Sequence, residues 1–181
     1  MFFKNDCIAL IIDIQGRLAE LVDGHEQLFK RNRLFAEAMG LLGVPLFYTE
    51  QMPEKMGSTR AELSDLLADA ECFEKSCFSC ASADGFMEAL ESSGRRCVLL
   101  SGIEAHICVC QTTLDLLDAG YEVCLMADAI SARDPEQKRI ALERLRDAGA
   151  RIGTVEMLIY ELMRDARDPV FKQMLQLVKT T

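Results

Sequence analysis

A histidine and two cysteines stand within five residues, at His106, Cys108 and Cys110, where an apolar run gives way to a helical pattern. Cys108 falls at the first turn of the expected helix. The helix dipole and the free backbone amides at that turn favour a thiolate, so we expect the pKa of Cys108 to be lowered. The same amides can hold an oxyanion. Cys108 is therefore the candidate nucleophile, and Cys110 is expected to pack in the core.

Two charged residues have the chemistry that such a nucleophile needs. Asp13 follows the first apolar run of the chain, and Lys75 follows a later one. A carboxylate can take the thiol proton and return it to the leaving group, while an ammonium group keeps that carboxylate ionised. The sequence therefore predicts a triad of Asp13, Lys75 and Cys108, provided that the three strand ends meet.

The elements that must bring these residues together are short apolar runs that alternate with longer helical patterns. This alternation is typical of βαβ units and a buried parallel sheet. Strands are expected at 7–13, 45–49, 72–75, 97–102, 122–127 and 151–155. Ligands of such sheets bind at the carboxyl ends of the strands, next to the topological switch point. Asp13, Lys75 and Cys108 all belong to that edge.

Helices are expected at 26–42, 60–68, 83–92, 108–119 and 135–148, with two more in 156–179 separated at Asp168-Pro169. The residue before a proline disfavours the helical conformation, which predicts that break. Asp134 as N-cap and Pro135 at the first helical position mark the start of one helix. The pattern Thr59 to Glu62 resembles a capping box for another.

Length and composition indicate one globular domain over residues 1–181. The chain has 50% hydrophobic residues, 27% charged residues and a net charge of −9. Apolar runs are too short to span a bilayer, and the negative charge opposes binding to a phosphate backbone, so neither a membrane nor nucleic acid is an expected partner. The first apolar run soon turns acidic, unlike a signal peptide. Cysteines within apolar runs suit a reducing compartment, so we expect a cytoplasmic protein.

Cys77 and Cys80 raise two alternatives, a metal site and a redox pair. They have the spacing of half a zinc site, but His106 and Cys108 lie two residues apart and do not face one way on a helix. We therefore predict no metal ligands. A redox protein would need Cys77 and Cys80 at a helix start, whereas the helix is expected to begin after Ala81 or Ser82. This alternative stays open.

Three motifs resemble the isochorismatase-like cysteine hydrolases, a family that includes nicotinamidases and N-carbamoylsarcosine amidase. They are "ALIIDIQ", "FEKSCFS" and "GIEAHICVCQTTLDLLDAGYEV", and the resemblance runs nearly end to end. It implies a Rossmann-like α/β fold, a three-layer sandwich with a central, mainly parallel six-stranded sheet. Carried over by motif, Asp13 is the proton acceptor, Lys75 the charge partner and Cys108 the nucleophile. The resemblance also implies a cis peptide at Ile103-Glu104 and an oxyanion hole made by backbone amides of 104–108.

One segment departs from the metal-binding members of that family. Nicotinamidases bind a metal through an Asp-x-His pair after the second strand, whereas "YTEQMPEKMGST" contains no histidine. The chain resembles instead the small, metal-free branch of isochorismatase domain-containing proteins. This resemblance implies no metal and no cofactor, and it implies a homo-oligomer, whether a dimer, a tetramer or a larger assembly.

The sequence thus predicts a cysteine hydrolase that cleaves a small amide or a related C–N bond through a thioester on Cys108. The substrate is expected to be a small molecule, with Gln15, Gln51, Phe78 and His106 as pocket walls. A second hypothesis is a scaffold or binding protein that has the same fold but no turnover.

Overall fold

A six-stranded parallel sheet forms the centre of the computed structural model, which describes residues 1–180. Its spatial order is β3-β2-β1-β4-β5-β6. The strands are β1 (Cys7–Ile12), β2 (Leu46–Gln51), β3 (Glu71–Lys75), β4 (Cys97–Ile103), β5 (Glu122–Ser131) and β6 (Arg151–Gly153). All neighbouring strands run parallel. The chain therefore returns each time through a crossover connection.

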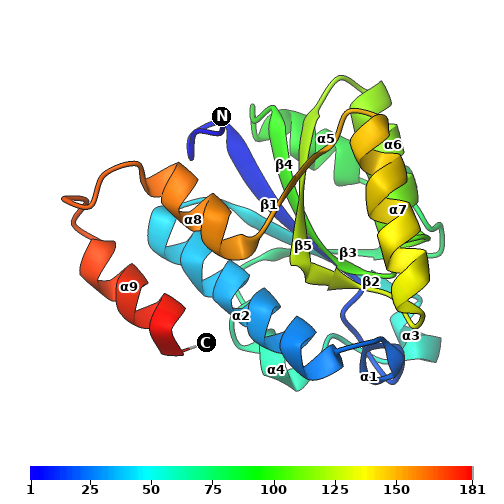
Figure 1. The fold of residues 1–181 in the computed structure, drawn as a ribbon. Coiled ribbons are helices and arrows are strands. Elements are labelled where there is room, and N and C mark those ends of the chain that lie inside the picture. Colours follow the sequence, from blue (N-terminus) through cyan, green and yellow to red (C-terminus); the bar gives the residue numbers. More distant parts are fainter. Residues whose placement is uncertain (181) are drawn as a thin grey trace.

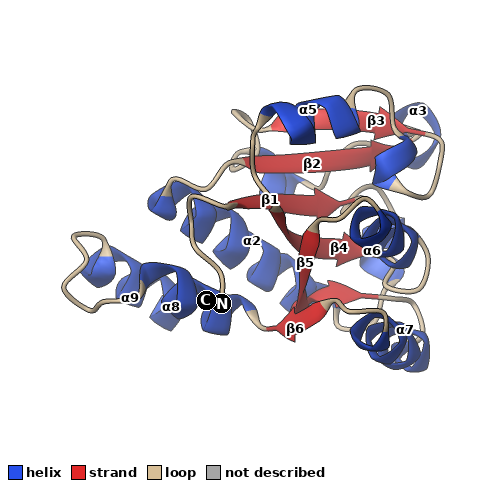
Figure 2. Cartoon of the chain, turned by 90° about the horizontal axis from the view of Figure 1, so that it is seen from above, coloured by secondary structure: helices blue, strands red, loops and turns tan. Residues whose placement is uncertain are grey.

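Helices cover both faces of the sheet (Figure 1). They are α1 (Leu18–Leu21), α2 (His25–Leu42), α3 (Pro53–Met56), α4 (Ala61–Ser64), α5 (Phe86–Ser92), α6 (Cys108–Asp118), α7 (Pro135–Asp147), α8 (Val155–Met163) and α9 (Phe171–Thr180). A 3₁₀ turn, η1, spans Cys80–Ser82. Helices α2, α8 and α9 lie on one face, and α5, α6 and α7 on the other (Figure 2). The expected three-layer α/β sandwich is confirmed.

The central strands are buried on both faces, which explains their continuous apolar runs. In β1, Cys7, Ala9 and Ile11 pack with α2 and α8, whereas the alternate residues Ile8 and Leu10 pack with α5 and α6. Side chains of a strand alternate between the two faces, so a strand inside a parallel sheet needs hydrophobic residues at every position. Because the strands are parallel, their carboxyl ends all lie at one edge of the sheet.

Several element bounds differ from the sequence predictions. The helix expected at 60–68 is shorter and consists of α4 alone. Thr59 does not cap it, because the Thr59 hydroxyl and amide both donate to the Glu50 carboxylate, each at 2.6 Å. Strand β5 continues to Ser131 after a register shift against β4. The short helices α1 and α3 were not predicted, since four residues are too few to show a helical period.

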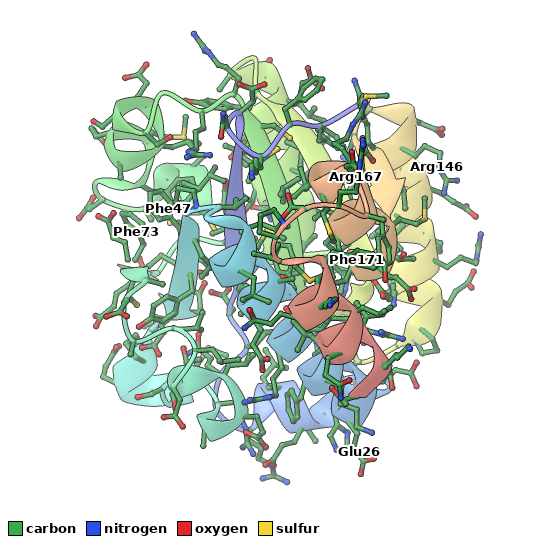
Figure 3. The ribbon with its side chains drawn as sticks, turned by 90° about the vertical axis from the view of Figure 1, so that its left-hand side faces the viewer. Glu26, Phe47, Phe73, Arg146, Arg167 and Phe171 are labelled. Carbon is green, nitrogen blue, oxygen red and sulfur yellow. The ribbon has the colours of Figure 1, made fainter. Side chains whose placement is uncertain are left out.

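The carboxyl-terminal region forms two helices, as expected, but the first one ends earlier than the predicted break. Helix α8 stops at Met163, before Arg164, which has a left-handed φ of 70°. Helix α9 then lies along α2, with Phe171 at its start (Figure 3). Among residues 1–180, no helix combines the length and apolarity that crossing a membrane requires.

Candidate active site

Asp13, Lys75 and Cys108 come together at the carboxyl edge of the sheet. Asp13 follows β1 directly, Lys75 is the last residue of β3, and Cys108 begins α6 after β4. Strands β1 and β4 are neighbours, and the chain leaves them toward opposite faces of the sheet. This topological switch point opens a crevice at the strand ends, and the three side chains meet there.

The Lys75 ammonium group contacts both of the other residues. Its Nζ lies 2.6 Å from Asp13 Oδ2 and 3.7 Å from Cys108 Sγ. It also donates to Gln51 Oε1 at 2.7 Å and to the Cys77 carbonyl at 3.3 Å. The side chains of Lys75 and Asp13 are almost completely buried. The ion pair is therefore shielded from water and held in one geometry.

Thr49 holds the other oxygen of the Asp13 carboxylate, a contact that the sequence reasoning missed. Its hydroxyl donates to Asp13 Oδ1 at 2.6 Å, and its carbonyl accepts the Asp13 amide at 3.2 Å. Asp13 itself has a left-handed φ of 52°. In the sequence, the available signal was a hydroxyl residue within the apolar run that forms β2. Its role becomes apparent only once β2 is known to lie beside β1.

The pKa of Cys108 is raised above its ordinary value, contrary to the expectation from the helix terminus. Burial of the thiol is the largest cause, and the charge of Asp13 adds to it, while Lys75 acts in the opposite direction. Burial by itself would lower the pKa of Lys75, but Asp13, Cys80 and Cys108 together outweigh it and that pKa is raised. The resting site is therefore a neutral thiol beside a carboxylate–ammonium pair.

The turn between β4 and α6 supplies backbone amides beside this thiol. The Ile103-Glu104 peptide bond is cis. The amides of Ile107 and Val109 both donate to the Glu104 carbonyl, at 3.0 and 3.3 Å, whereas the Cys108 amide finds no acceptor within residues 1–180. The Glu104 carboxylate accepts the Arg133 amide at 2.9 Å and pairs with its guanidinium group at 3.1 Å. An oxyanion beside Cys108 would therefore meet a free N–H donor.

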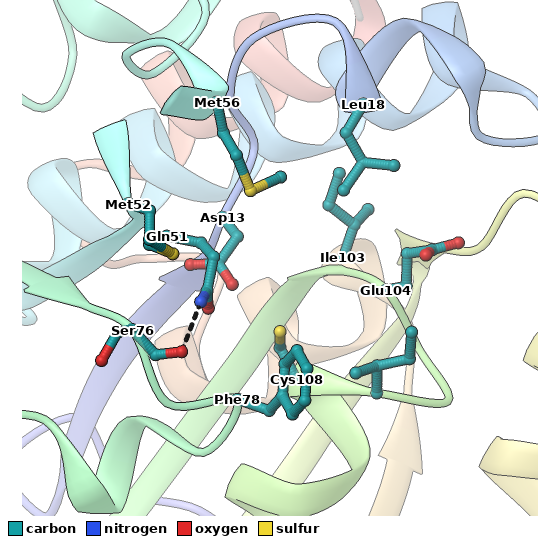
Figure 4. Close-up of a pocket in the computed structure, with 11 residues that line it drawn as sticks. Asp13, Leu18, Gln51, Met52, Met56, Ser76, Phe78, Ile103, Glu104 and Cys108 are labelled. Carbon is teal, nitrogen blue, oxygen red and sulfur yellow. Dashed lines mark hydrogen bonds between the residues drawn. The ribbon is translucent and has the colours of Figure 1, made fainter. Parts of the chain in front are cut away.

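A cavity of about 310 Å³ opens beside these groups (Figure 4). It is lined by Asp13, Leu18, Gln51, Met52, Met56, Ser76, Phe78, Ile103, Glu104, Ile107 and Cys108. Gln51 and Phe78 thus lie where the sequence predicted pocket walls. The cavity is large enough for a small organic molecule next to the thiol.

Gln15 and His106 do not line this cavity. The Gln15 side chain is fully buried, accepts the Gln51 amide at 2.5 Å, and donates to the carbonyls of Gln51 and Gly57 at 3.0 and 2.6 Å. All of its amide groups are therefore engaged within the protein, and its role is to hold the 51–57 segment. His106 is partly buried, and its Nδ1 has no partner within the described residues.

Cys77 and Cys80 occupy different environments. Cys80 is completely buried, and its amide donates to Thr112 Oγ1 at 2.9 Å, whereas Cys77 is partly exposed. Burial raises the pKa of Cys80 to about 12, and the charge of Asp13 adds to this effect. A completely buried thiol that does not line the cavity is out of reach of an oxidant or a partner thiol, so Cys80 is a poor redox residue. In residues 1–180, no three His, Cys, Asp or Glu side chains form a group that could hold a metal ion.

Comparison with known proteins places this chain in a protein family. The model of the Isochorismatase domain family matches residues 7–157. The chain belongs to the isochorismatase family.

Particular relatives resemble the chain over almost its whole length. It is 41% identical to isochorismatase domain-containing protein 2 of Bos taurus over 170 residues, which cover 93% of this chain and 81% of the relative. It is 36% identical to the secreted isochorismatase effector Isc1 of Phytophthora sojae, over 97% of this chain and 85% of the relative. Among solved structures, MAR1 ribonuclease from Caenorhabditis elegans superposes with a TM-score of 0.93 at 30% identity, over 99% and 93% of the two chains.

Proposed function

We propose that the protein is a cysteine hydrolase that cleaves a small amide or a related C–N bond. The observation that carries this proposal is the Lys75 ammonium group, which lies 2.6 Å from Asp13 Oδ2 and 3.7 Å from Cys108 Sγ. It unites a candidate base and a candidate nucleophile in one buried cluster beside a cavity. Nucleophile, base and a third group that orients the base are the arrangement that covalent catalysis requires.

In the first step, Cys108 Sγ attacks the substrate carbonyl while its proton passes to Asp13. The carbonyl oxygen becomes an oxyanion beside the free amide of Cys108. When the tetrahedral intermediate collapses, Asp13 gives that proton to the nitrogen, the C–N bond breaks, and the amine leaves. An amine leaves poorly unless it is protonated, so a base that already holds a proton favours C–N cleavage.

In the second step, Asp13 takes a proton from water, and the hydroxide attacks the thioester carbonyl. The C–S bond then breaks, the acid is released, and the proton returns to the Cys108 sulfur. Thr49 and Lys75 hold one carboxylate oxygen each, at 2.6 Å in both cases. Both oxygens of Asp13 are therefore kept in place through the cycle.

A panel of small primary amides and carbamoyl compounds tests this function, with ammonia release as the readout. We expect turnover by the wild type and no turnover by Cys108→Ala. The matched control is Cys110→Ala, which removes a buried thiol two residues away and should keep the activity. Rapid acid quenching and intact-mass analysis should detect the acyl group on Cys108. If Cys108→Ala retained full activity, the proposed nucleophile would be wrong.

The same experiments address the alternatives. A binding protein without turnover predicts no acyl adduct with any substrate, although ligands still bind. A redox protein predicts instead a disulfide between Cys77 and Cys80 under mild oxidation, and the complete burial of Cys80 disfavours this.

We expect this chain to have no ribonuclease activity, unlike the relative that is named as a ribonuclease. The net charge of −9 and a cavity without a basic lining residue in the described part of the chain are poorly suited to a polyphosphate backbone. Incubation with single-stranded RNA should leave the RNA intact.

For assembly and location, we propose a cytoplasmic homo-oligomer. All eight cysteines are free, which suits a reducing compartment. Exposed large hydrophobic side chains include Ile140, Met157 and Tyr160, which could lie between subunits. Light scattering coupled to size-exclusion chromatography should give a mass of at least twice the monomer mass, and a monomer would contradict the proposal.

A further inference from the structure

The cavity beside Cys108 has an apolar side and a reactive side. In Figure 4, the Cys108 sulfur points toward the space between Asp13 and Ile103, and Leu18 and Met56 close the far side of that space. Aliphatic and thioether side chains on that side offer no hydrogen bond to a substrate group. The part of the substrate away from the scissile bond would therefore meet hydrophobic surface.

The charges that line the cavity are negative. Asp13 and Glu104 both contribute to its wall, and none of the lining residues in the described part of the chain is basic. Both carboxylates are buried, so water screens their charge poorly. A further anion in this space would need a free cation to compensate its charge.

The two cations that pair with these carboxylates are engaged with protein groups. Lys75 Nζ is shared by Asp13, Gln51 and the Cys77 carbonyl, at 2.6, 2.7 and 3.3 Å. The Arg133 guanidinium group pairs with the Glu104 carboxylate at 3.1 Å. Lys75 cannot turn toward a substrate carboxylate without leaving the buried Asp13 carboxylate unpaired, which is strongly unfavourable. Arg133 has a side chain that is 58% exposed, and it does not line the cavity.

We propose that this cavity admits neutral carboxamides with an apolar acyl group and excludes acyl groups that carry a carboxylate. The inference rests on the proposed function, because it specifies the substrate of the same Cys108 site. A carboxylate that entered would lose its hydration and would gain no cation in return. The family's name refers to isochorismate, which carries two carboxylates, so that compound is predicted to be excluded from this chain's cavity.

Met56 and Leu18 are the residues that set this preference, and the backbone near Met56 is tightly held. A Cβ at Gly16 would lie 1.7 Å from the Met56 carbonyl oxygen, and Gln15 holds the Gly57 carbonyl at 2.6 Å. The volume of about 310 Å³ lies at the lower end of small-molecule sites. It is large enough for an acyl group of about six carbons.

Two amides of equal length test the proposal, hexanamide and adipamate, in which a carboxylate replaces the terminal methyl group. Binding is measured by ligand-observed NMR to Cys108→Ala, so that the result does not depend on turnover. We expect hexanamide to bind at least about 100-fold more tightly than adipamate, and isochorismate not to bind. Turnover by the wild type should show the same order.

A cation placed on the apolar side should reverse the preference. In the Cys108→Ala background, Met56→Arg should improve adipamate binding by at least about tenfold and weaken hexanamide binding. Met56→Leu is the matched control and should preserve the wild-type order. Leu18→Lys makes the same test from another element, should Met56→Arg fail to fold.

The outcomes separate this inference from the proposed function. Equal binding of both amides, preferred binding of adipamate, or no binding of hexanamide would overturn the selectivity. Selective binding of hexanamide to Cys108→Ala supports it, even if the wild type forms no acyl adduct with any amide. In that last case the proposed function would fail while the selectivity of the cavity stood.

Discussion

Lys75 Nζ lies 2.6 Å from Asp13 Oδ2, and the two side chains are 0% and 3% exposed. A buried ion pair of this kind is costly to break from one side, because the remaining charge stays without a partner. The neutral thiol of Cys108 lies against this pair. Stability and chemistry at this site therefore depend on the same contact.

Removal of the Lys75 charge should destabilise the fold as well as the activity. We expect Lys75→Met to lower the free energy of unfolding by about 3–5 kcal/mol, since Asp13 is left buried and unpaired. Urea denaturation followed by circular dichroism measures this loss. The double variant Asp13→Asn with Lys75→Met should recover part of the stability but no activity. A single variant as stable as the wild type would contradict the pairing.

The Thr49 hydroxyl should matter for catalysis more than for the fold. Thr49→Val keeps the shape of the side chain but removes the donor to Asp13 Oδ1. We expect a loss of kcat of about tenfold and a stability loss of about 1–3 kcal/mol. Thr49→Ser retains the hydroxyl and should keep most of the activity. If Thr49→Val and the wild type had equal kcat, the Thr49 hydroxyl would have no role in catalysis.

The buried thiols should make stability fall at alkaline pH. Burial raises the pKa of Cys80 from 9.0 to about 12. The folded chain therefore holds a proton that the unfolded chain has lost, so the stabilisation is complete below pH 9 and decreases toward pH 12. Urea denaturation from pH 8 to 10.5 gives the free energy of unfolding. Above pH 9 it should fall less steeply in Cys80→Ala than in the wild type, by about 1 kcal/mol per pH unit. Val98→Ala creates a buried cavity in the same core and should keep the wild-type slope.

Thiol labelling should distinguish Cys108 from the other cysteines. A small alkylating agent can reach Cys108 through the cavity, whereas Cys7, Cys80 and Cys97 are at most 4% exposed. Peptide mass spectrometry after iodoacetamide treatment should find Cys108 modified well before those three. The rate at Cys108 should fall several-fold in Asp13→Asn, because Asp13 takes the thiol proton. Unchanged labelling of Cys108 in that variant would contradict a base role for Asp13.

Gly16 should tolerate no side chain. Its φ is 48°, and a Cβ there would lie 1.7 Å from the Met56 carbonyl oxygen. We expect Gly16→Ala to cost at least about 2 kcal/mol of stability and to weaken substrate binding, because the 51–57 segment must move. The control is Gly40→Ala in helix α2, where nothing lies within 4 Å of an added Cβ. That variant should gain up to about 1 kcal/mol. Similar thermal stability of Gly16→Ala and the wild type would refute the close approach.

Local patterns in the sequence determined the sheet and which residues end its strands. Continuous apolar runs between helical patterns predicted six strands in a buried parallel sheet. The helix from Pro135 follows its predicted cap, with Asp134 accepting the Glu136 amide at 2.9 Å. The sequence was sufficient to propose a triad of Asp13, Lys75 and Cys108, because a residue's place at a strand end is a local property. Their meeting depended only on the general rule that parallel strands end at one edge.

Only the tertiary structure decided how these groups are held and charged. Thr49 and Gln15 act through neighbours 36 positions away, and such long-range contacts leave no spacing pattern in the chain. The pKa of Cys108 rises although the helix terminus favours the thiolate, because burial and Asp13 together outweigh that local effect. Strand identity follows from periodicity along the chain, whereas burial and charge at a site depend on everything that packs around it.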